Sequence, residues 1–407
     1  MKILISAYSC EPSKGSERGV GWNVSREVAQ HHEVWVLTRP DESREAIEAE
    51  LAIRPVPNLH FVYFTLPFWR DSLRWGQSGA IQLHYYFWQI QAYFVGKQLH
   101  QEINFDAIHH VTFVKYSCPS FLSLLPVPFV WGPVGGGESA PWAFWSDFNW
   151  KNKLYEVARL LSRSIGELDI FTRMTAQRSV IAYATTVDTA NRVSKLNAPW
   201  VQIYSAIGLL PAEMAELAQC PPPSNSPVRF ISIARLLHWK GLHLGLRAFA
   251  EAKLAAAEYW ILGEGAEMPH LKNLALKLGI AHQVKFFGLL PREEVLTKLG
   301  DCSVLVHPSL HDSGAGVCLE AMAAGRPVIC LDLGGPAAQV NPETGIKVSA
   351  FHPAQSVNEL SAAMVHLATN HHLCLQMGRA GQQRVWDFYS WEAKGKQFAQ
   401  IYEDIAI

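Results

Sequence analysis

The sequence of 407 residues lacks the features that would place it in several common classes of protein. Its 35 Lys and Arg residues balance 36 Asp and Glu residues, so it has no overall basic character of the kind that binds nucleic acid. No run approaches the roughly 20 continuous apolar residues of a membrane-spanning helix. The seven cysteines are scattered, odd in number and never in C-x-x-C spacing, which predicts reduced thiols.

Several catalytic signatures are missing as well. The chain has no G-x-G-x-x-G opening a helix after a strand and no G-x-S-x-G, which argues against a dinucleotide-dependent dehydrogenase and a serine hydrolase. It has no D-x-D and no local set of three or four metal ligands, so we expect neither a metal nor a cofactor. The apolar run at the amino terminus is too short for a signal peptide and is typical of a first core strand.

What the sequence does contain is a regular alternation of strand and helix patterns. This alternation predicts α/β domains, each with a parallel sheet covered by helices. The length predicts two domains of about 200 residues. The segment Gln219–Pro227 holds four prolines in nine residues, cannot continue a helix or a central strand, and marks the boundary. The expected strands are 2–7, 33–38, 59–63, 107–111, 128–131, 180–185, 228–233, 259–262, 284–287, 303–306 and 328–331.

The most informative stretch is His307–Asp332. A short strand leads into a glycine-rich turn and then into a helix, roughly Val317–Ala324, that Gly325 ends. Free N–H groups and the helix dipole at such a turn make an anion site. Asp312 and Glu320, on either side of the turn, add acceptors for hydroxyl groups. A phosphate together with hydroxyls predicts a ligand such as a nucleotide sugar.

Three further motifs follow expected strands in the second half. Arg235 and Lys240 lie where a diphosphate would bind, although a basic pair alone is common on any surface. Gly263 and Gly265 form a G-x-G turn, for which a purely structural role is equally consistent. Leu289 follows another strand, where the backbone can hydrogen-bond the edge of a base.

The first half offers two glycine loops after strands and a pair of histidines. The first loop opens a helix and is suited to cradling a phosphate or an acceptor. The second has three successive glycines, which are costly unless the backbone must approach something or move. His109 and His110 end a strand, and the residues alone leave a structural and a functional role open. The loop candidates are Gly15, Ser16, Glu17, Gly19, Gly135, Gly136, Gly137 and Glu138.

The segment Phe61–Leu99 is unusually rich in aromatic residues. Its rings indicate either an apolar acceptor groove or a surface that touches a membrane, with plain core packing as the alternative. The densest part contains Tyr85, Tyr86, Phe87, Trp88, Tyr93 and Phe94.

Taken together, these motifs resemble the retaining GT-B glycosyltransferases of glycosyltransferase family 4. The family's R-x(4)-K pair matches Arg235 and Lys240, and its P-S-x-x-E-G-x-G-x-x-x-L-E-A-M-A-x-G-x-P-V block matches Pro308–Val328. The resemblance covers most of the chain and is strongest from about residue 228 to 335. It implies an α/β protein of two doubly wound Rossmann-like domains facing an interdomain cleft. The implied parts are an acceptor-binding domain (1–215), a donor-binding domain (216–390) and a helix crossing back to the first domain (391–407).

The resemblance also implies roles for individual residues. Arg235 and Lys240 would hold the donor's diphosphate, and Glu320 the ribose hydroxyls. Asp312 would contact the transferred sugar. Gly316 and Val317 would offer backbone N–H groups to the distal phosphate. The other donor-binding candidates are Gly263, Gly265, Leu289, Ser313, Gly314 and Ala315.

Two departures from the family pattern stand out. Asp312-Ser313-Gly314-Ala315 replaces the common E-G-F-G, and the second histidine of the family's D-x-x-H-x-H falls on Val111. The active-site histidine therefore stays open between His109 and His110. With these two, the catalytic candidates are Asp312, Arg235 and Lys240.

The expected function is transfer of a sugar, with retention of anomeric configuration, from a UDP- or GDP-linked donor to a glycan or lipid-linked acceptor. Polysaccharide or glycolipid biosynthesis would be the setting. The alternatives are a phosphorylase or epimerase with the same fold, and an inactive scaffold. We expect no nucleic-acid partner and a cytoplasmic location, with peripheral contact at the inner face of the plasma membrane as a further alternative.

Overall fold

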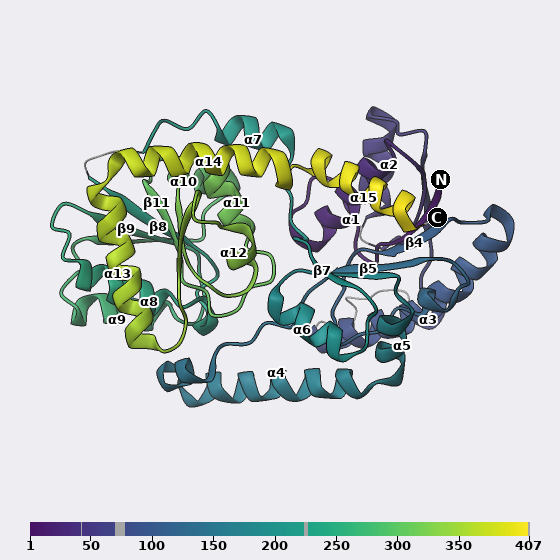
Figure 1. Ribbon diagram of the computed structural model, residues 1–407, viewed down its shortest axis with the longest axis horizontal. Helices are drawn as coiled ribbons and strands as arrows, with labels where there is room; N and C mark the ends of the chain where they lie inside the picture. Colours follow the sequence, from purple (N-terminus) through teal and green to yellow (C-terminus); the bar gives the residue numbers. More distant parts are fainter. Residues whose placement is uncertain (42, 70–77, 224–226, 406–407) are drawn as a thin grey trace. The chain divides into compact units, whose positions relative to one another are not determined.

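The computed structural model describes residues 1–41, 43–69, 78–223 and 227–405 (Figure 1). The chain folds into two compact units, each with its own sheet and core. Unit 1 comprises Met1–Gly137, Arg159–Ile207 and Trp391–Ile407. Unit 2 comprises Glu138–Ala158 and Gly208–Ser390.

Unit 1 is built on a seven-stranded parallel sheet with the order β3-β2-β1-β4-β5-β6-β7. Its strands are β1 (Lys2–Ser6), β2 (Glu33–Thr38), β3 (Leu59–Tyr63), β4 (Ala107–His110), β5 (Phe129–Val134), β6 (Ile181–Ala184) and β7 (Val201–Ile203). Its helices are α1 (Ser16–Val28), α2 (Arg44–Ile53), α3 (Ser78–Ile103), η1 (Phe121–Leu124), α5 (Ile170–Arg178), α6 (Val187–Lys195) and α15 (Trp391–Ile405).

Unit 2 is built on a six-stranded parallel sheet with the order β10-β9-β8-β11-β12-β13. The strands are β8 (Arg229–Ile233), β9 (Glu258–Leu262), β10 (Val284–Gly288), β11 (Val304–His307), β12 (Val328–Leu331) and β13 (Gly345–Val348). The helices are η2 (Trp142–Asp147), α7 (Pro211–Leu217), η3 (His238–Lys240), α8 (Leu242–Ala252), α9 (Met268–Lys277), α10 (Arg292–Gly300), α11 (Gly316–Ala323), α12 (Gly334–Gln339), α13 (Pro353–Thr369) and α14 (His371–Tyr389). Helix α4 (Trp150–Leu168) begins in unit 2 and ends in unit 1.

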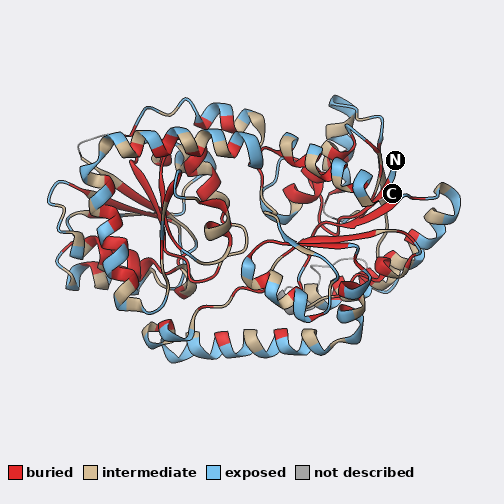
Figure 2. Cartoon of the chain, viewed as in Figure 1, coloured by how far each residue is buried: buried red, intermediate tan, exposed pale blue. Residues whose placement is uncertain are grey.

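The strands form where the sequence is continuously apolar, because a parallel sheet is covered by helices on both faces. Figure 2 shows buried residues concentrated in the strands of both sheets. The predicted strands begin and end within one residue of the observed ones, except that β5 continues to Val134, three residues beyond the predicted end. Strands β7 and β13, which each lie at the edge of a sheet, were not predicted. Edge strands pair on one side only, so their short sequences V-Q-I and G-I-K-V need not be fully apolar.

In both sheets the strand order reverses once, between β1 and β4 in unit 1 and between β8 and β11 in unit 2. At such a switch point the loops after the two strands leave in opposite directions and open a crevice at the carboxyl edge of the sheet. Ligands of doubly wound sheets bind there. The loops that follow β8 and β11 carry the motifs that the sequence singled out.

The chain passes between the units at points that differ in part from the sequence expectation. The crossings follow Gly137, Ala158, Ile207 and Ser390, whereas the expected ones followed residues 215 and 390. Glu138–Ala158, expected in the first domain, belongs to unit 2. Of the proline-rich segment, residues 224–226 lie outside the described part of the chain.

Core packing accounts for the main rings of the aromatic segment. Tyr85 and Trp88, on α3, are buried in the core of unit 1. Tyr8 packs edge-on against both rings, at 5.1 and 5.3 Å between centroids. Phe87 and Phe94 face outward, and residues 70–77 of the segment lie outside the described part of the chain.

The described residues include no helix with both the length and the apolar character needed to cross a bilayer. All seven cysteines carry free thiols, as the sequence predicts. Burial raises the pKa of the Cys330 thiol to about 12, so this side chain is a protonated, apolar part of the core.

The docking of α15 on α1 supplies a stability test within unit 1. A Cβ added at Gly395 would lie 2.4 Å from the Cβ of Glu27, so Gly395→Ala forces the two helices apart. We expect the free energy of unfolding to fall by about 1–3 kcal/mol in a urea titration. Gly15→Ala is the matched control, because nothing lies within 4 Å of its added Cβ. Equal stability of the two variants would contradict this packing.

Candidate active site

The switch point of unit 2 brings together two loops that are distant in the sequence. β8 pairs with β11, with Phe230 opposite Val304. Beyond the strands, the backbone N–H of Leu310 donates to the carbonyl of Trp239 at 2.7 Å. Gly241 has φ of 65°, and a Cβ there would lie 1.9 Å from the carbonyl oxygen of Pro308, so only glycine fits this approach. The backbone itself therefore holds the loop of Lys240 against the loop of Asp312.

Lys240, His307 and Asp312 form the charged centre of this site. The Lys240 ammonium donates to Oδ2 of Asp312, and Nε2 of His307 lies 3.2 Å from the same oxygen. The side chain of Asp312 is 16% exposed. Burial by itself raises the pKa of this carboxyl group, but hydrogen bonds from His307 and Lys240 and their charges outweigh it and hold the pKa well below its usual range. Asp312 is therefore an ionised acceptor at neutral pH.

The turn after Asp312 is fixed by close backbone contacts. Ala315 adopts φ of 48°, a left-handed conformation that a residue with a side chain rarely takes, and leads directly into α11. Gly335 donates its N–H to the carbonyl of Asp312 at 2.7 Å. The hydroxyl of Ser313 donates to the buried carboxylate of Glu138 at 2.6 Å. These contacts hold the amino end of α11 next to Asp312, and N–H groups at the start of a helix are suited to binding an anion.

Glu320 lies one turn further along α11 than the Gly316–Val317 N–H groups. Its carboxylate accepts a hydrogen bond of 2.8 Å from Nη1 of Arg292, on α10. Burial raises the pKa of Glu320, and the charge and hydrogen bond of Arg292 partly oppose this shift. Arg292 thus orients a largely buried carboxylate of the kind that can accept hydrogen bonds from hydroxyl groups.

The other donor-binding candidates lie around the same edge of the sheet. Arg235 is exposed, and no ion pair of it is found within the described part of the chain. Gly263 has φ of 123°, and a Cβ there would lie 2.0 Å from the carbonyl oxygen of Ala234. Gly265 approaches Leu236 in the same way, so the G-x-G turn supports the loop of Arg235 and Lys240. The side chain of Leu289 is 75% exposed at the end of β10.

A second cluster flanks the centre and was not found from the sequence. Glu156, on α4, is buried and accepts hydrogen bonds from Nε2 of His238 at 2.9 Å and Nε2 of His311 at 3.2 Å. The ring of Trp239 stacks on those of His311 and Tyr155, each at 5.2 Å. His238 and His311 neighbour Lys240 and Asp312 in sequence, so this cluster braces both loops.

Unit 1 encloses both candidate histidines. His109 lies between the hydroxyl of Tyr402, 2.5 Å from Nδ1, and the carbonyl of Gly132, 2.6 Å from Nε2. His110 lies 3.1 Å from the hydroxyl of Tyr85. Burial is the main cause that lowers the pKa of His109 to about 4 and that of His110 to about 3. Both rings are neutral at neutral pH and are inaccessible to solvent.

The two glycine loops of unit 1 have different surroundings. The loop of Gly15, Ser16 and Gly19 is near the switch point of unit 1, since the carboxylate of Glu17 accepts the N–H of Phe113 at 2.8 Å. In the second loop Gly137 donates its N–H to the hydroxyl of Thr189 at 3.0 Å. A Cβ there would lie 2.5 Å from Cα of Thr189, so close packing explains this glycine. Gly135 pairs with Lys115, and Gly136 has φ of 92°.

The structure thus brings together only some of the site residues that were predicted from the sequence. Lys240, Asp312, Ser313 and Glu138 meet around one turn of unit 2. His109, His110 and the loop of Gly15 belong to unit 1. The sequence reasoning missed His307 and Arg292, whose roles depend on contacts that no motif encodes. Among the described residues, no group of three or more His, Cys, Asp or Glu has a metal-binding arrangement.

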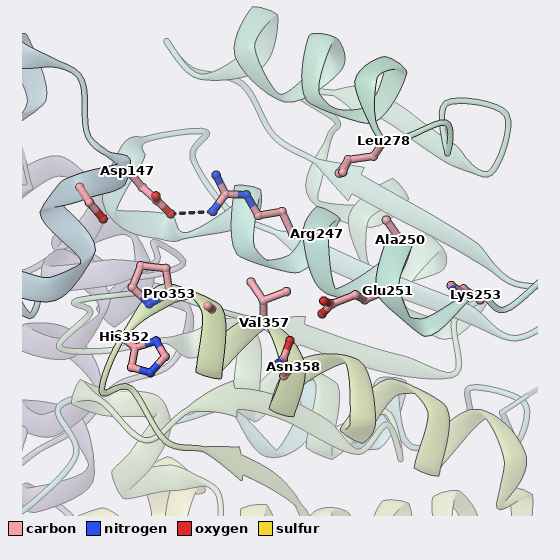
Figure 3. Close-up of a pocket in the computed structure, with 12 residues that line it drawn as sticks. Asp147, Arg247, Ala250, Glu251, Lys253, Leu278, His352, Pro353, Val357 and Asn358 are labelled. Carbon is pink, nitrogen blue, oxygen red and sulfur yellow. Dashed lines mark hydrogen bonds and ion pairs between the residues drawn. The ribbon is translucent and has the colours of Figure 1, made fainter.

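Unit 2 also contains a cavity of about 740 Å³ that is separate from these residues. It lies between α8 and the start of α13, where Arg247 reaches the carboxylate of Asp147 at 2.8 Å (Figure 3). Val357 lies on the α13 side of the cavity. None of the predicted donor-binding residues lines it.

Comparison with known proteins places this site in a family. The profile of the family described as Glycosyl transferases group 1 matches residues 217–384. The D-inositol 3-phosphate glycosyltransferase of Corynebacterium diphtheriae is 30% identical over 184 residues, which are 43% of this chain and 42% of that protein. A glycogen synthase of Mycobacterium tuberculosis is 27% identical over 183 residues, 44% of this chain and 43% of that protein. The chain therefore matches less than half the length of these relatives.

Solved structures resemble the whole chain in fold. The sucrose-phosphate synthase of Thermosynechococcus elongatus gives a TM-score of 0.62 at 16% identity, with 99% of this chain and 98% of that chain covered. The Anabaena protein HepE, solved in complex with UDP, gives 0.61 at 16% identity, with 99% and 100% covered.

The chain has the GT-B fold, with one switch point in each of its two parallel α/β sheets, and the loops of Lys240 and Asp312 lie at the switch point of unit 2. Within this chain, residues 217–384 match the glycosyl transferases group 1 family, and Lys240, His307 and Asp312 lie in that span. The predicted α/β fold class is confirmed, and the predicted family is confirmed for residues 217–384.

The enclosed His109 predicts a pH dependence of stability. Its folded pKa of about 4 lies below the usual 6.5, so between these values the unfolded chain binds a proton that the folded chain does not. The stabilisation is complete above about pH 6.5 and is lost as the pH falls toward 4. When the pH is lowered from about 7 to about 5, the free energy of unfolding of the wild type should decrease. In His109→Gln, urea titrations should show a decrease that is smaller by about 2 kcal/mol.

His270→Gln, at an exposed position of unit 2, is the matched control and should follow the wild type. An unchanged pH dependence in His109→Gln would show that this ring titrates normally in the folded protein.

Proposed function

We propose that this protein is a retaining glycosyltransferase that moves a sugar from a UDP- or GDP-linked donor to a glycan or lipid-linked acceptor. Polysaccharide or glycolipid biosynthesis is the proposed setting. The observation that carries the proposal is the cluster of Lys240, His307 and Asp312 at the switch point of unit 2. It lies beside the amino end of α11, one turn before Glu320.

The donor would be held by complementary charges and acceptors. Its diphosphate is an anion, for which Lys240, the exposed Arg235 and the first-turn N–H groups of α11 are suitable partners. The ribose offers two hydroxyls, and the Glu320 carboxylate that Arg292 orients can accept both. Gly263, Gly265 and Leu289 would line the path of the base along the sheet edge.

The same groups would favour the transfer step. As the bond from the sugar to the diphosphate breaks, negative charge grows on the leaving phosphate, and fixed cations that already point there stabilise it without rearranging. Asp312 stays ionised and accepts hydrogen bonds from the sugar. The leaving phosphate can take the proton of the incoming hydroxyl, so retention requires no covalent bond to the enzyme.

Unit 1 would supply the acceptor surface through the loop of Gly15, Ser16 and Glu17 at its own switch point. His109 and His110 would not transfer protons in this scheme, since both rings are enclosed and neutral. They would instead position the strands around that loop.

The donor site is tested first by ligand-induced thermal shifts with UDP, GDP, ADP and their sugar conjugates. One nucleotide series should raise the melting temperature, because a ligand that binds only the folded state stabilises it. Glu320→Ala removes the ribose acceptor and should weaken that nucleotide by about tenfold or more. Glu294→Ala, an exposed carboxylate on α10, is the matched control. A folded wild type that responds to no nucleotide would overturn the proposal and favour a scaffold.

A second variant separates transfer from binding. Asp312→Asn keeps the shape of the side chain but removes its charge, so we expect kcat for sugar transfer to fall by at least about 100-fold while the nucleotide shift persists. Asp332→Asn, on an exposed carboxylate, should leave both unchanged. Full transfer activity in Asp312→Asn would show that this carboxylate does not contact the reacting sugar. Release of sugar only with inorganic phosphate would indicate a phosphorylase.

A further inference from the structure

Helix α4 packs in the reverse of the usual sense. A surface helix normally turns its apolar stripe to the core and its polar residues to water. In α4 the charged residues Glu156, Arg163 and Glu167 are buried or partly buried against the protein, whereas most of the large apolar residues are exposed. Figure 2 shows that most of this helix is exposed.

The inward side of α4 is held by polar contacts along its length. In unit 2, the buried Glu156 bonds His238 and His311. In unit 1, Arg163 is buried, and Glu167 accepts 2.6 and 2.8 Å hydrogen bonds from Arg192 and Tyr116. A Cβ on Gly166 would lie 2.4 Å from the carbonyl of Ser117. These contacts fix which side of the helix points outward.

The outward side is an uninterrupted apolar stripe. Its members recur at steps of three or four residues, which places them on one face of a helix. Their exposed fractions run from 39% at Val157 to 71% at Ile165 and Leu168. The apolar stripe consists of Trp150, Leu154, Val157, Leu161, Ile165 and Leu168. Ile170, at the start of α5, continues it with 70% exposure.

The charges beside the Trp150 end of the stripe are positive, whereas Asp169, at the other end, caps α5 by accepting the N–H of Phe171. Lys151 and Lys153 are exposed next to Trp150, and the Lys151 ammonium lies 5.7 Å from that ring. The acidic residues of α4 are Glu156 and Glu167, and both are engaged on the inward side. An aliphatic stripe with an aromatic ring at one end and flanking lysines matches the interface of a bilayer with anionic headgroups.

We propose that the apolar stripe of α4 docks in the plane of an anionic lipid bilayer, with Leu161 and Ile165 among the acyl chains and Lys151 and Lys153 at the headgroups. This surface goes beyond the proposed donor chemistry. It would hold the enzyme where lipid-linked acceptors are found, and it lies on a different element from the aromatic segment that the sequence suggested.

The test is flotation of the whole protein with vesicles of phosphatidylcholine, with and without phosphatidylglycerol. The wild type should float with the anionic vesicles and lose part of that binding as salt screens the lysines. Leu161→Ser with Ile165→Ser removes the centre of the stripe and should lower the partition coefficient by about tenfold or more.

Two further variants make the result specific. Ile53→Ser with Leu276→Ser removes exposed aliphatic side chains elsewhere, 74% and 65% exposed, and should float as the wild type does. Lys151→Glu with Lys153→Glu should reduce binding to anionic vesicles by about thirtyfold or more, with little effect on neutral ones.

The proposal would be overturned if the wild type does not bind vesicles. It would also be overturned if the serine variant and the glutamate variant both bind as strongly as the wild type. If the wild type instead forms dimers in light scattering that Leu161→Ser with Ile165→Ser dissociates, a second copy of the chain covers the stripe. The nucleotide thermal shift is read in the same samples. It should persist in every stripe variant, so failure of the membrane surface and failure of the donor site are distinguishable.

Discussion

The ion pair between Lys240 and Asp312 is the interaction on which the rest of the site depends. The two residues are 72 positions apart, and only the neighbouring positions of β8 and β11 bring them together. A carboxylate this enclosed would be costly without a partner, and Lys240 with His307 supplies two. The turn that opens α11 directly follows Asp312 of this pair. It is held by hydrogen bonds from the Gly335 N–H to the carbonyl of Asp312 and from the Ser313 hydroxyl to Glu138.

The two loops that carry Lys240 and Asp312 also contact α4. Glu156 bonds His238 and His311, which adjoin the two residues of the ion pair. To place this carboxylate inward, α4 must turn its polar side to the protein, and its apolar stripe is then left facing outward. The same contacts that brace the donor loops therefore create the surface that we assign to a bilayer. A helix with a conventional apolar inner face would have provided neither.

Much of the fold could be predicted from the sequence, because parallel strands buried on both faces are read directly as apolar runs. β2, β3 and β12 begin and end at the predicted residues. β7 and β13 could not be predicted, since pairing on one side relaxes the demand for apolar residues. In the site, Asp312 and Glu320 were recognised from their local turn. His307 and Arg292 were not, because their partners are chosen by the packing of loops and helices.

The histidines of unit 1 show most clearly the difference between what is predictable from local sequence and what depends on tertiary contacts. Their place at the end of β4 is a local property that the sequence determined. Their enclosure by Tyr402, from the far end of the chain, and by Gly132 is not. The sequence by itself determined the alternation of strands and helices, the glycine turns and the family resemblance of residues 217–384. Only the tertiary structure decided which charges pair, which histidines are sealed and which face of α4 meets solvent, because these depend on desolvation and on contacts between residues far apart in the chain.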